Sequence, residues 1–203
     1  MRSKMELSVP LLRMRTGAKH EIPSALLLVA QGLEAAAMDF AYGIAQQPSM
    51  QSWAGEDLLK DIGRRSVFRI WRYDAGVGCR PHYDPGICTA LLKASAGGLE
   101  FGKYPCRSHG NDENTLLQPD WFPPQLPVDT ADTMVLAGNM TGLLSRGAIP
   151  AVLHRVRSDW ADHVDSKRYS LVVELRPAEP NRWYKLLGHC SVAHGCVSLR
   201  GCG

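Results

Sequence analysis

The stretch His82-Tyr-Asp-Pro-Gly-Ile-Cys-Thr-Ala-Leu-Leu-Lys-Ala-Ser-Ala-Gly-Gly-Leu-Glu-Phe101 opens with an H-x-D pair, continues as an apolar run and ends after two glycines. His82 and Asp84 are two residues apart, so on a β-strand their side chains would point to the same side. Gly97-Gly98 predicts a tight turn, because glycine adopts a positive φ at little cost. Leu99 to Phe101 would then return as the second arm of a β-hairpin.

A second histidine, His154, stands far along the chain and could complete a metal site with the H-x-D pair. Two imidazoles and one carboxylate can occupy one face of an octahedral Fe(II) and leave three adjacent positions for other ligands. An H-x-D pair alone is a frequent chance match, and the alternative is a solvated Asp84 beside a core His82. The residues by themselves therefore suggest a metal site without establishing one.

Short apolar runs separated by glycine and proline recur along the second half of the chain. Thr133–Ala137, Ala151–Val156 and Tyr169–Leu175 are typical of buried strands, and Ser66–Tyr73 alternates as a strand should. This pattern predicts a mainly β fold, an antiparallel sandwich or barrel such as a jelly roll.

Three segments, in the right chain order, resemble the plant-type 2-oxoglutarate/Fe(II)-dependent dioxygenases (isopenicillin N synthase-like). The stretch from His82 to Phe101 is similar to the family's H-T-D-x-G-x-x-T-L-L-x-x-x-x-x-G-G-L-Q-V. The second segment is V-L-A-G-N-M-T-G-L-L-S-R-G-A-I-P-A-V-L-H-R-V, from Val135 to Val156, and resembles V-x-x-G-D-x-L-x-x-x-S-N-G-x-x-x-S-x-x-H-R-V. The third is R-Y-S-L-V-V-E-L-R-P, from Arg168 to Pro177, and resembles R-x-S-x-x-x-F-x-x-P.

The resemblance implies a double-stranded β-helix (jelly-roll) core that binds Fe(II) through His82, Asp84 and His154. It further implies that Arg168 grips the C5 carboxylate of 2-oxoglutarate, the co-substrate, because a guanidinium can bind a carboxylate bidentately. Ser170 would add a hydroxyl to that site. Ascorbate is a further cofactor that the resemblance allows.

Several of these residues have a second interpretation. Arg168 could instead form a surface ion pair with Glu174 or Asp165. Tyr73 could donate its hydroxyl to 2-oxoglutarate or serve as a core tyrosine. Arg155, directly after the second histidine, should face away from the metal and form a structural ion pair.

The activity that the resemblance implies is oxidation of a small organic metabolite, most simply a hydroxylation, with release of succinate and CO₂. The carboxylate of Asp84 favours this over halogenation, because the related halogenases lack it. Two alternatives stay open: an iron oxidase of the same fold that uses no 2-oxoglutarate, with Arg168 and Ser170 holding the substrate's own carboxylate, or a non-catalytic metal-binding relative.

We expect three regions in the chain. Residues 1–65 would form an N-terminal extension with supporting helices, including a helix from Pro23 to about Ala45 with the helical apolar period and a shorter one at Trp53–Arg64. Residues 66–178 would form the dioxygenase core, and 179–203 an irregular tail. No segment before Ser66 matches the family's usual N-terminal region, so we expect a shortened relative, with a fragment as the alternative.

Two local features of the sequence lie in the core region and in the tail. Pro105–Pro127, rich in Pro, Asn, Asp, Gly and Ser, predicts a loop inserted between the iron-binding segments. Cys190, Cys196 and Cys202 are expected to be reduced thiols in the tail, because their spacing does not suit a zinc site.

Composition limits the partners. The 203 residues carry 23 basic and 20 acidic side chains, a net charge of +3, which is too small to demand nucleic acid or a membrane. We therefore expect a small-molecule substrate and O₂ as partners, no nucleic acid, no membrane and a monomer. A cytoplasmic location is expected, with organelle targeting by the basic N-terminus as the alternative.

Overall fold

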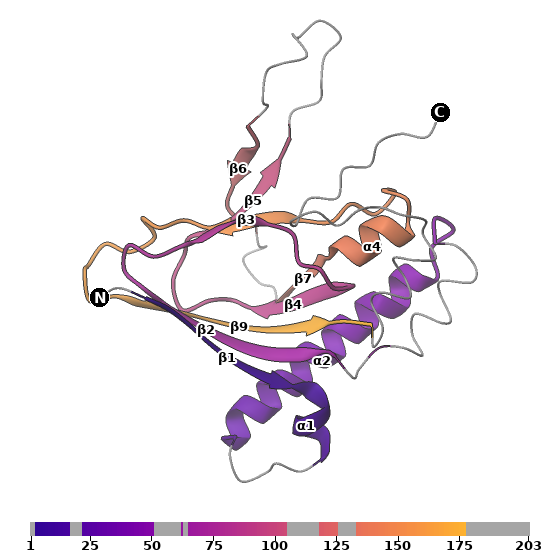
Figure 1. Cartoon of the computed structure of the whole chain (residues 1–203), viewed down its shortest axis with the longest axis horizontal. Coiled ribbons are helices and arrows are strands. Elements are labelled where there is room, and N and C mark those ends of the chain that lie inside the picture. Colours follow the sequence, from indigo (N-terminus) through magenta and orange to yellow (C-terminus); the bar gives the residue numbers. More distant parts are fainter. Residues whose placement is uncertain are drawn as a thin grey trace, which may run out of the picture.

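The computed structural model describes residues 3–16, 22–50, 62, 65–104, 118–125 and 133–177. In this part of the chain, two antiparallel sheets lie face to face, with orders β1-β2-β9-β4-β7 (the major sheet) and β3-β8-β5-β6 (the minor sheet) (Figure 1). The strands are β1 (Lys4–Pro10), β2 (Val67–Asp74), β3 (Cys79–His82), β4 (Cys88–Leu92), β5 (Leu99–Lys103), β6 (Asp120–Phe122), β7 (Thr133–Ala137), β8 (Leu153–Val156) and β9 (Lys167–Leu175). The helices are α1 (Leu11–Thr16), α2 (Ser24–Ala45) and α4 (Asn139–Leu144).

The chain moves repeatedly from one sheet to the other. It passes from β2 in the major sheet to β3 in the minor sheet, back to β4, across to β5 and β6, and so on to β9. This alternation is the winding of a double-stranded β-helix, and the predicted jelly-roll core is confirmed.

The predicted β-hairpin at Gly97-Gly98 is wrong. Strand β4 pairs with β7 and β9, whereas β5 pairs with β6 and β8, so the two glycines carry the chain between sheets. Gly98 has φ of 96°, and a Cβ there would lie 2.5 Å from Cβ of Trp160. Sequence pattern predicted the turn, but strand partners depend on contacts between distant segments.

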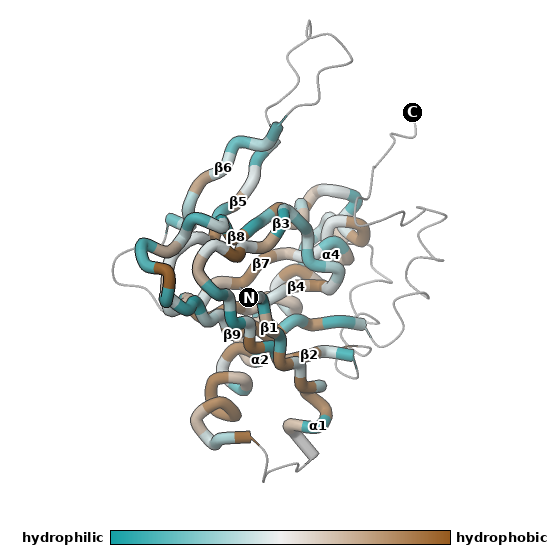
Figure 2. The backbone as a smooth tube through the Cα atoms, turned by 60° about the vertical axis from the view of Figure 1, so that its left-hand side comes forward, coloured by the Kyte–Doolittle hydropathy of each residue, from teal (hydrophilic) through white to brown (hydrophobic). Residues whose placement is uncertain are grey.

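Helix α2 begins at Ser24 after Pro23, as predicted, because proline fixes φ before a helix without needing an N–H partner. Its buried residues recur at helical spacing on one face: Ala30, Leu33, Ala37, Ala41 and Ile44. That face packs against β4, β9 and β7. By length and composition alone α2 could also cross a membrane. Figure 2 shows that α2 is largely hydrophobic, and its buried residues belong to the core.

The two faces of the major sheet have different characters. Phe68, Val173 and Leu175 are buried on the face that packs against α2, where they form the hydrophobic core. Alternate residues of the same strands, such as Arg69 and Ser170, face the space between the two sheets. The main apolar core therefore lies outside the sandwich, between sheet and helix, and the interior of the sandwich holds charged and polar side chains beside apolar ones such as Leu91, Leu136 and Val172.

Three further elements differ from the expectations. Strand β6 lies inside Pro105–Pro127, which was predicted to be a loop throughout. Helix α4 follows β7 directly, a segment to which no helix was assigned. Strand β1, from the region 1–65, pairs along its whole length with β2. The predicted helix at Trp53–Arg64, apart from Ile62, and the tail from 179 lie outside the described residues.

Asp74, at the end of β2, contacts the residue before β1 and the first residue of β9. Its carboxylate accepts a hydrogen bond from the backbone N–H of Ser3 at 2.9 Å and lies 3.2 Å from Nζ of Lys167. The Ser3 N–H and the neighbouring Lys167 cation hold the pKa of Asp74 below its usual value. A carboxylate of this kind stabilises the fold above its unfolded-state pKa of about 4, and the contribution is lost as pH falls through the native pKa.

Asp74→Asn should therefore lower the free energy of unfolding at pH 7 but much less at pH 3, where the wild-type carboxyl is itself becoming protonated. Urea unfolding followed by circular dichroism at the two pH values measures the difference. Asp39→Asn, at an exposed position of α2, serves as the control and should have little effect at either pH. An equal loss at pH 7 and pH 3 would contradict a role for the charge.

Candidate metal centre and adjoining cavity

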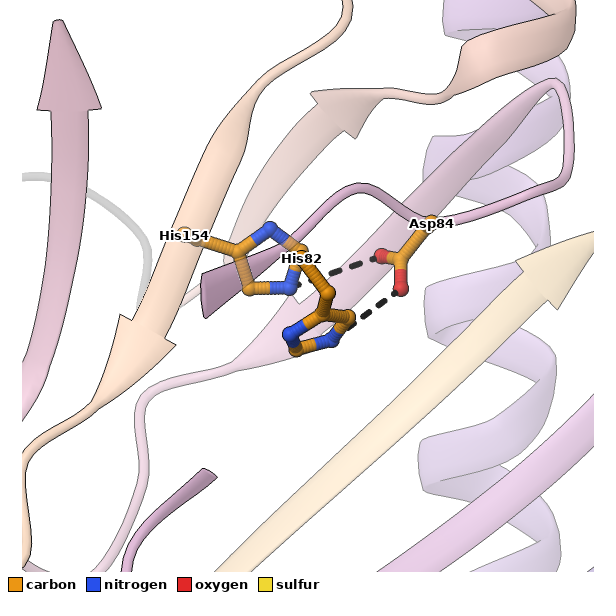
Figure 3. A group of neighbouring side chains, drawn as sticks. All are labelled: His82, Asp84 and His154. Atoms are coloured by element: carbon orange, nitrogen blue, oxygen red, sulfur yellow. Dashed lines mark ion pairs between the residues drawn. The ribbon is translucent and has the colours of Figure 1, made fainter. Parts of the chain in front are cut away.

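His82, Asp84 and His154 come together in space, and their side chains point toward one another (Figure 3). One potential ligand atom from each lies within 4.8 Å of the others. The Nε2 atoms of His82 and His154 are each 3.8 Å from an oxygen of Asp84. The histidines are cross-strand partners of β3 and β8, which explains how residues far apart in sequence meet.

The spacing of the H-x-D pair had suggested that both residues lie on one strand, but the structure does not place them so. His82 is the last residue of β3, and Asp84 lies in the turn that follows. This turn is held by α4: the backbone N–H of Asn139 donates to the carbonyl of Asp84 at 2.8 Å. A Cβ on Gly138 would lie 2.2 Å from the carbonyl oxygen of Gly86, so only glycine permits this approach. Asn139 replaces the family's Asp, but the contact uses its backbone, which any non-proline residue supplies.

Both histidines are oriented by backbone carbonyls. Nδ1 of His82 lies 2.8 Å from the carbonyl oxygen of Arg80, and Nδ1 of His154 lies 3.0 Å from that of Val152. A carbonyl can only accept, so each Nδ1 carries the proton and each Nε2 keeps its lone pair when the ring is neutral. Such a hydrogen bond at the far nitrogen is typical of metal-binding histidines.

The protonation of the two histidines is shifted in opposite directions. Burial lowers the pKa of His154, which favours the neutral ring that a metal requires. Hydrogen bonding with the Cys79 thiol raises the pKa of His82. With one carboxylate between two imidazoles, the donor set fits a divalent transition metal.

A cavity of about 370 Å³ adjoins the three residues and runs between the sheets. Arg168, Ser170 and Tyr73, which the sequence assigned to 2-oxoglutarate, all line it. Arg168 is 2% exposed; its Nε donates to the carbonyl of Gly97 at 2.8 Å, while its buried Nη1 has no hydrogen-bond partner among the residues that the structure describes. An unpaired guanidinium nitrogen away from water is costly, and a bound carboxylate would satisfy it.

The structure bears on the second interpretations of Arg168, Tyr73 and Arg155. Glu174 pairs with Arg69 and Arg176 instead of Arg168, and among the described residues Arg168 forms no ion pair with Asp165 either.

Tyr73 is buried beside Arg168, whose Cζ lies 5.3 Å from the ring centroid. Burial raises the pKa of Tyr73, so its hydroxyl remains a donor. Arg155 faces outward and pairs with Glu100 at 2.7 Å, as expected.

Sequence reasoning missed a charged network that lines the rest of the cavity. The carboxylate of Glu174, 1% exposed, contacts Arg69 and lies 2.7 Å from Nε of Arg176. Arg69 also lies 2.8 Å from Glu6 on β1. The sequence held one sign of this network: Glu174, a charged residue, stands where the family pattern has Phe. Lys4, whose Nζ lies 3.9 Å from the ring centroid of Trp71, was missed as well.

No family model matches the chain, and no curated protein matches it by sequence. Among solved structures, a proposed oxygenase from Shewanella oneidensis matches with a TM-score of 0.56 and 18% identity, over 90% of this chain and 70% of that one. A 2OG-Fe(II) oxygenase family protein from Caulobacter crescentus matches with a TM-score of 0.55 and 21% identity, over 88% and 58%. JOX2, solved in complex with 2OG, Fe and JA, matches with a TM-score of 0.54 and 16% identity, over 86% and 50%.

The chain has the fold of these oxygenases. At such identities the likeness establishes the fold alone, and the chain spans 50% to 70% of the length of the three proteins. The structure neighbours do not distinguish the plant-type branch from others.

Replacing Asp84 or His154 with Ala should weaken binding of Mn(II) or anaerobic Fe(II) by more than about 100-fold, because each removes one of three ligands. The matched control is His163→Ala, an exposed histidine away from the group. Calorimetric titration measures the affinities, and circular dichroism checks the fold. Metal binding that survives in Asp84→Ala, or is lost equally in His163→Ala, would argue against this site.

Glu174→Ala should lower the free energy of unfolding by about 3 kcal/mol, because it leaves Arg69 and Arg176 without their shared buried partner. Asp159→Ala removes an ion pair with Arg157 in which the Asp side chain is 76% exposed, and should cost much less. Urea unfolding of both variants provides the comparison. Equal destabilisation would mean that the network contributes no more than a surface pair.

Proposed function

We propose that the protein is an Fe(II)- and 2-oxoglutarate-dependent oxygenase that oxidises a small organic molecule. The observation that carries the proposal is the unpaired, buried Nη1 of Arg168 in the cavity that also contains the His82–Asp84–His154 group, as seen in the described part of the chain. Both groups face one cavity. A metal held by the three ligands would bind the 2-oxo acid end of a 2-oxo dicarboxylate, and the cation of Arg168 would bind the carboxylate at the other end.

Each residue of the site would have a defined task. The three ligands would hold the metal from one side, with the hydrogen bonds of the imidazoles to Arg80 and Val152 fixing the ring planes. Arg168 would orient the distal carboxylate of 2-oxoglutarate through two N–H groups, and Ser170 and the protonated Tyr73 would offer hydroxyls to the same region. When bound, Fe(II) with 2-oxoglutarate and O₂ would supply the oxidising chemistry and release succinate and CO₂.

The type of substrate, the reaction and the family branch are also proposals. A small-molecule substrate is supported by the complex of JOX2 with 2OG, Fe and JA. We infer hydroxylation and membership of the plant-type branch from the three sequence segments. Ascorbate dependence, a monomeric state and a cytoplasmic location remain predictions. The iron oxidase alternative keeps Arg168 but gives it the carboxylate of the substrate.

The proposal predicts that 2-oxoglutarate binds the Mn(II)-loaded protein and that Arg168→Ala weakens this binding about 10- to 100-fold, the loss expected for hydrogen bonds to a charged group. Metal affinity should not change, because Arg168 is not a ligand. Arg157→Ala, with a side chain 44% exposed, is the matched control and should bind 2-oxoglutarate normally.

Titration calorimetry gives both affinities. Failure of 2-oxoglutarate to bind a metal-loaded, folded protein would favour the iron oxidase. Equal 2-oxoglutarate affinity in wild type and Arg168→Ala would remove Arg168 from the site.

A further inference from the structure

A row of ring side chains crosses the minor sheet from the candidate metal ligands outward. The pairing register places His82 opposite His154, His154 opposite Phe101, and Phe101 opposite Phe122. Directly opposed residues of antiparallel strands point to the same face of the sheet. Phe101 is therefore the next side chain beyond His154, on the same face as the metal ligands, and Phe122 follows it.

The residues around this row confirm which face it occupies. Leu99 and Val156, which are also opposed and lie two residues from Phe101 and His154, line the cavity. Trp121 and Arg155 have the opposite parity and contact each other, with Cζ of the arginine 4.1 Å from the ring centroid. Trp121 and Arg155 thus lie on the opposite side of β5, β6 and β8 from the row of rings, and the side that carries the row ends beyond the two phenylalanines at the opposed pair Lys103 and Asp120.

The two phenylalanines form an open aromatic surface. Their ring centroids are 6.1 Å apart at an interplanar angle of 70°, and Phe122 is 40% exposed. Neither belongs to the hydrophobic core between α2 and the major sheet. With strands spaced by about 4.8 Å, the row extends about 10 Å beyond His154, the length of a molecule with two fused rings.

We propose that Phe101 and Phe122 bind the substrate, and that the substrate is a small molecule with a flat, uncharged, conjugated ring system. The inference rests on the proposed function, which brings the oxidised atom close to His154. Both side chains are rings without charge, so they favour an aromatic face by offset or edge contact over an ionic or heavily hydroxylated molecule. The row begins at His154, so a ring lying on it has one edge at the metal centre.

The test uses protein loaded with one equivalent of Mn(II) and saturated with 2-oxoglutarate, with 2-naphthol as the probe. Paramagnetic relaxation of the naphthol protons, measured by NMR, reports both binding and closeness to the metal. Wild-type protein should broaden the probe, and His154→Ala, which removes the metal ligand, should not. Phe122→Leu should weaken probe binding about three- to tenfold, since it keeps apolar bulk but removes the ring.

Tyr104→Leu is the matched control: it removes another exposed ring, 51% exposed, directly after β5. It should leave the relaxation unchanged. Phe101→Leu should act like Phe122→Leu, and a saturated bicyclic alcohol should be broadened less than naphthol.

The outcomes separate the two proposals. If Mn(II) or 2-oxoglutarate fails to bind, the proposed function fails. If both bind but naphthol is not broadened, or is broadened equally with Phe122→Leu, the aromatic substrate surface is overturned while the oxygenase proposal stands.

Discussion

The alternation of side chains along β9 is the constraint on which the rest of the structure depends. This strand lies in the middle of the major sheet, between β2 and β4. Its odd-numbered residues Val173 and Leu175 are buried in the core against α2, and Leu171 packs against this core. Its even-numbered residues, from Arg168 to Glu174, face the cavity. A shift of one residue would exchange the two sets, exposing charges to the core and filling the cavity with apolar side chains.

This division explains how a cavity that holds charged as well as apolar side chains persists inside a small protein. The apolar burial that stabilises the fold comes mainly from the contact of α2 with the outer face of the major sheet, so the space between the sheets need not be filled. Buried charges there are tolerated where they are paired, as with Glu174 and its two arginines. Arg168 differs from the other arginines of the cavity because, within the described residues, it has no carboxylate partner and its buried Nη1 has no hydrogen-bond partner. A site that binds a carboxylate ligand would explain this difference.

Much of the fold could be predicted from local pattern. Strand β7 and helix α2 have the expected bounds, because apolar periodicity and a preceding proline are local signals. The meeting of His82 with His154 followed from the family resemblance, since no local pattern specifies which strands pair. The hairpin at Gly97-Gly98 was wrong for the same reason. The charged network was missed because the alternation of β2 does not specify which set of its side chains faces the interior of the sandwich. In the structure Phe68 packs into the core with α2, and Arg69 lines the cavity.

The central claim is that one cavity holds both a metal ion and 2-oxoglutarate. The most direct measurement is anaerobic titration of the protein with Fe(II) and 2-oxoglutarate, monitored for the weak visible charge-transfer band of the iron chelate. The account predicts that the band appears only when both are present, and that Asp84→Ala abolishes it. Tight Fe(II) binding without any band at saturating 2-oxoglutarate would contradict the account.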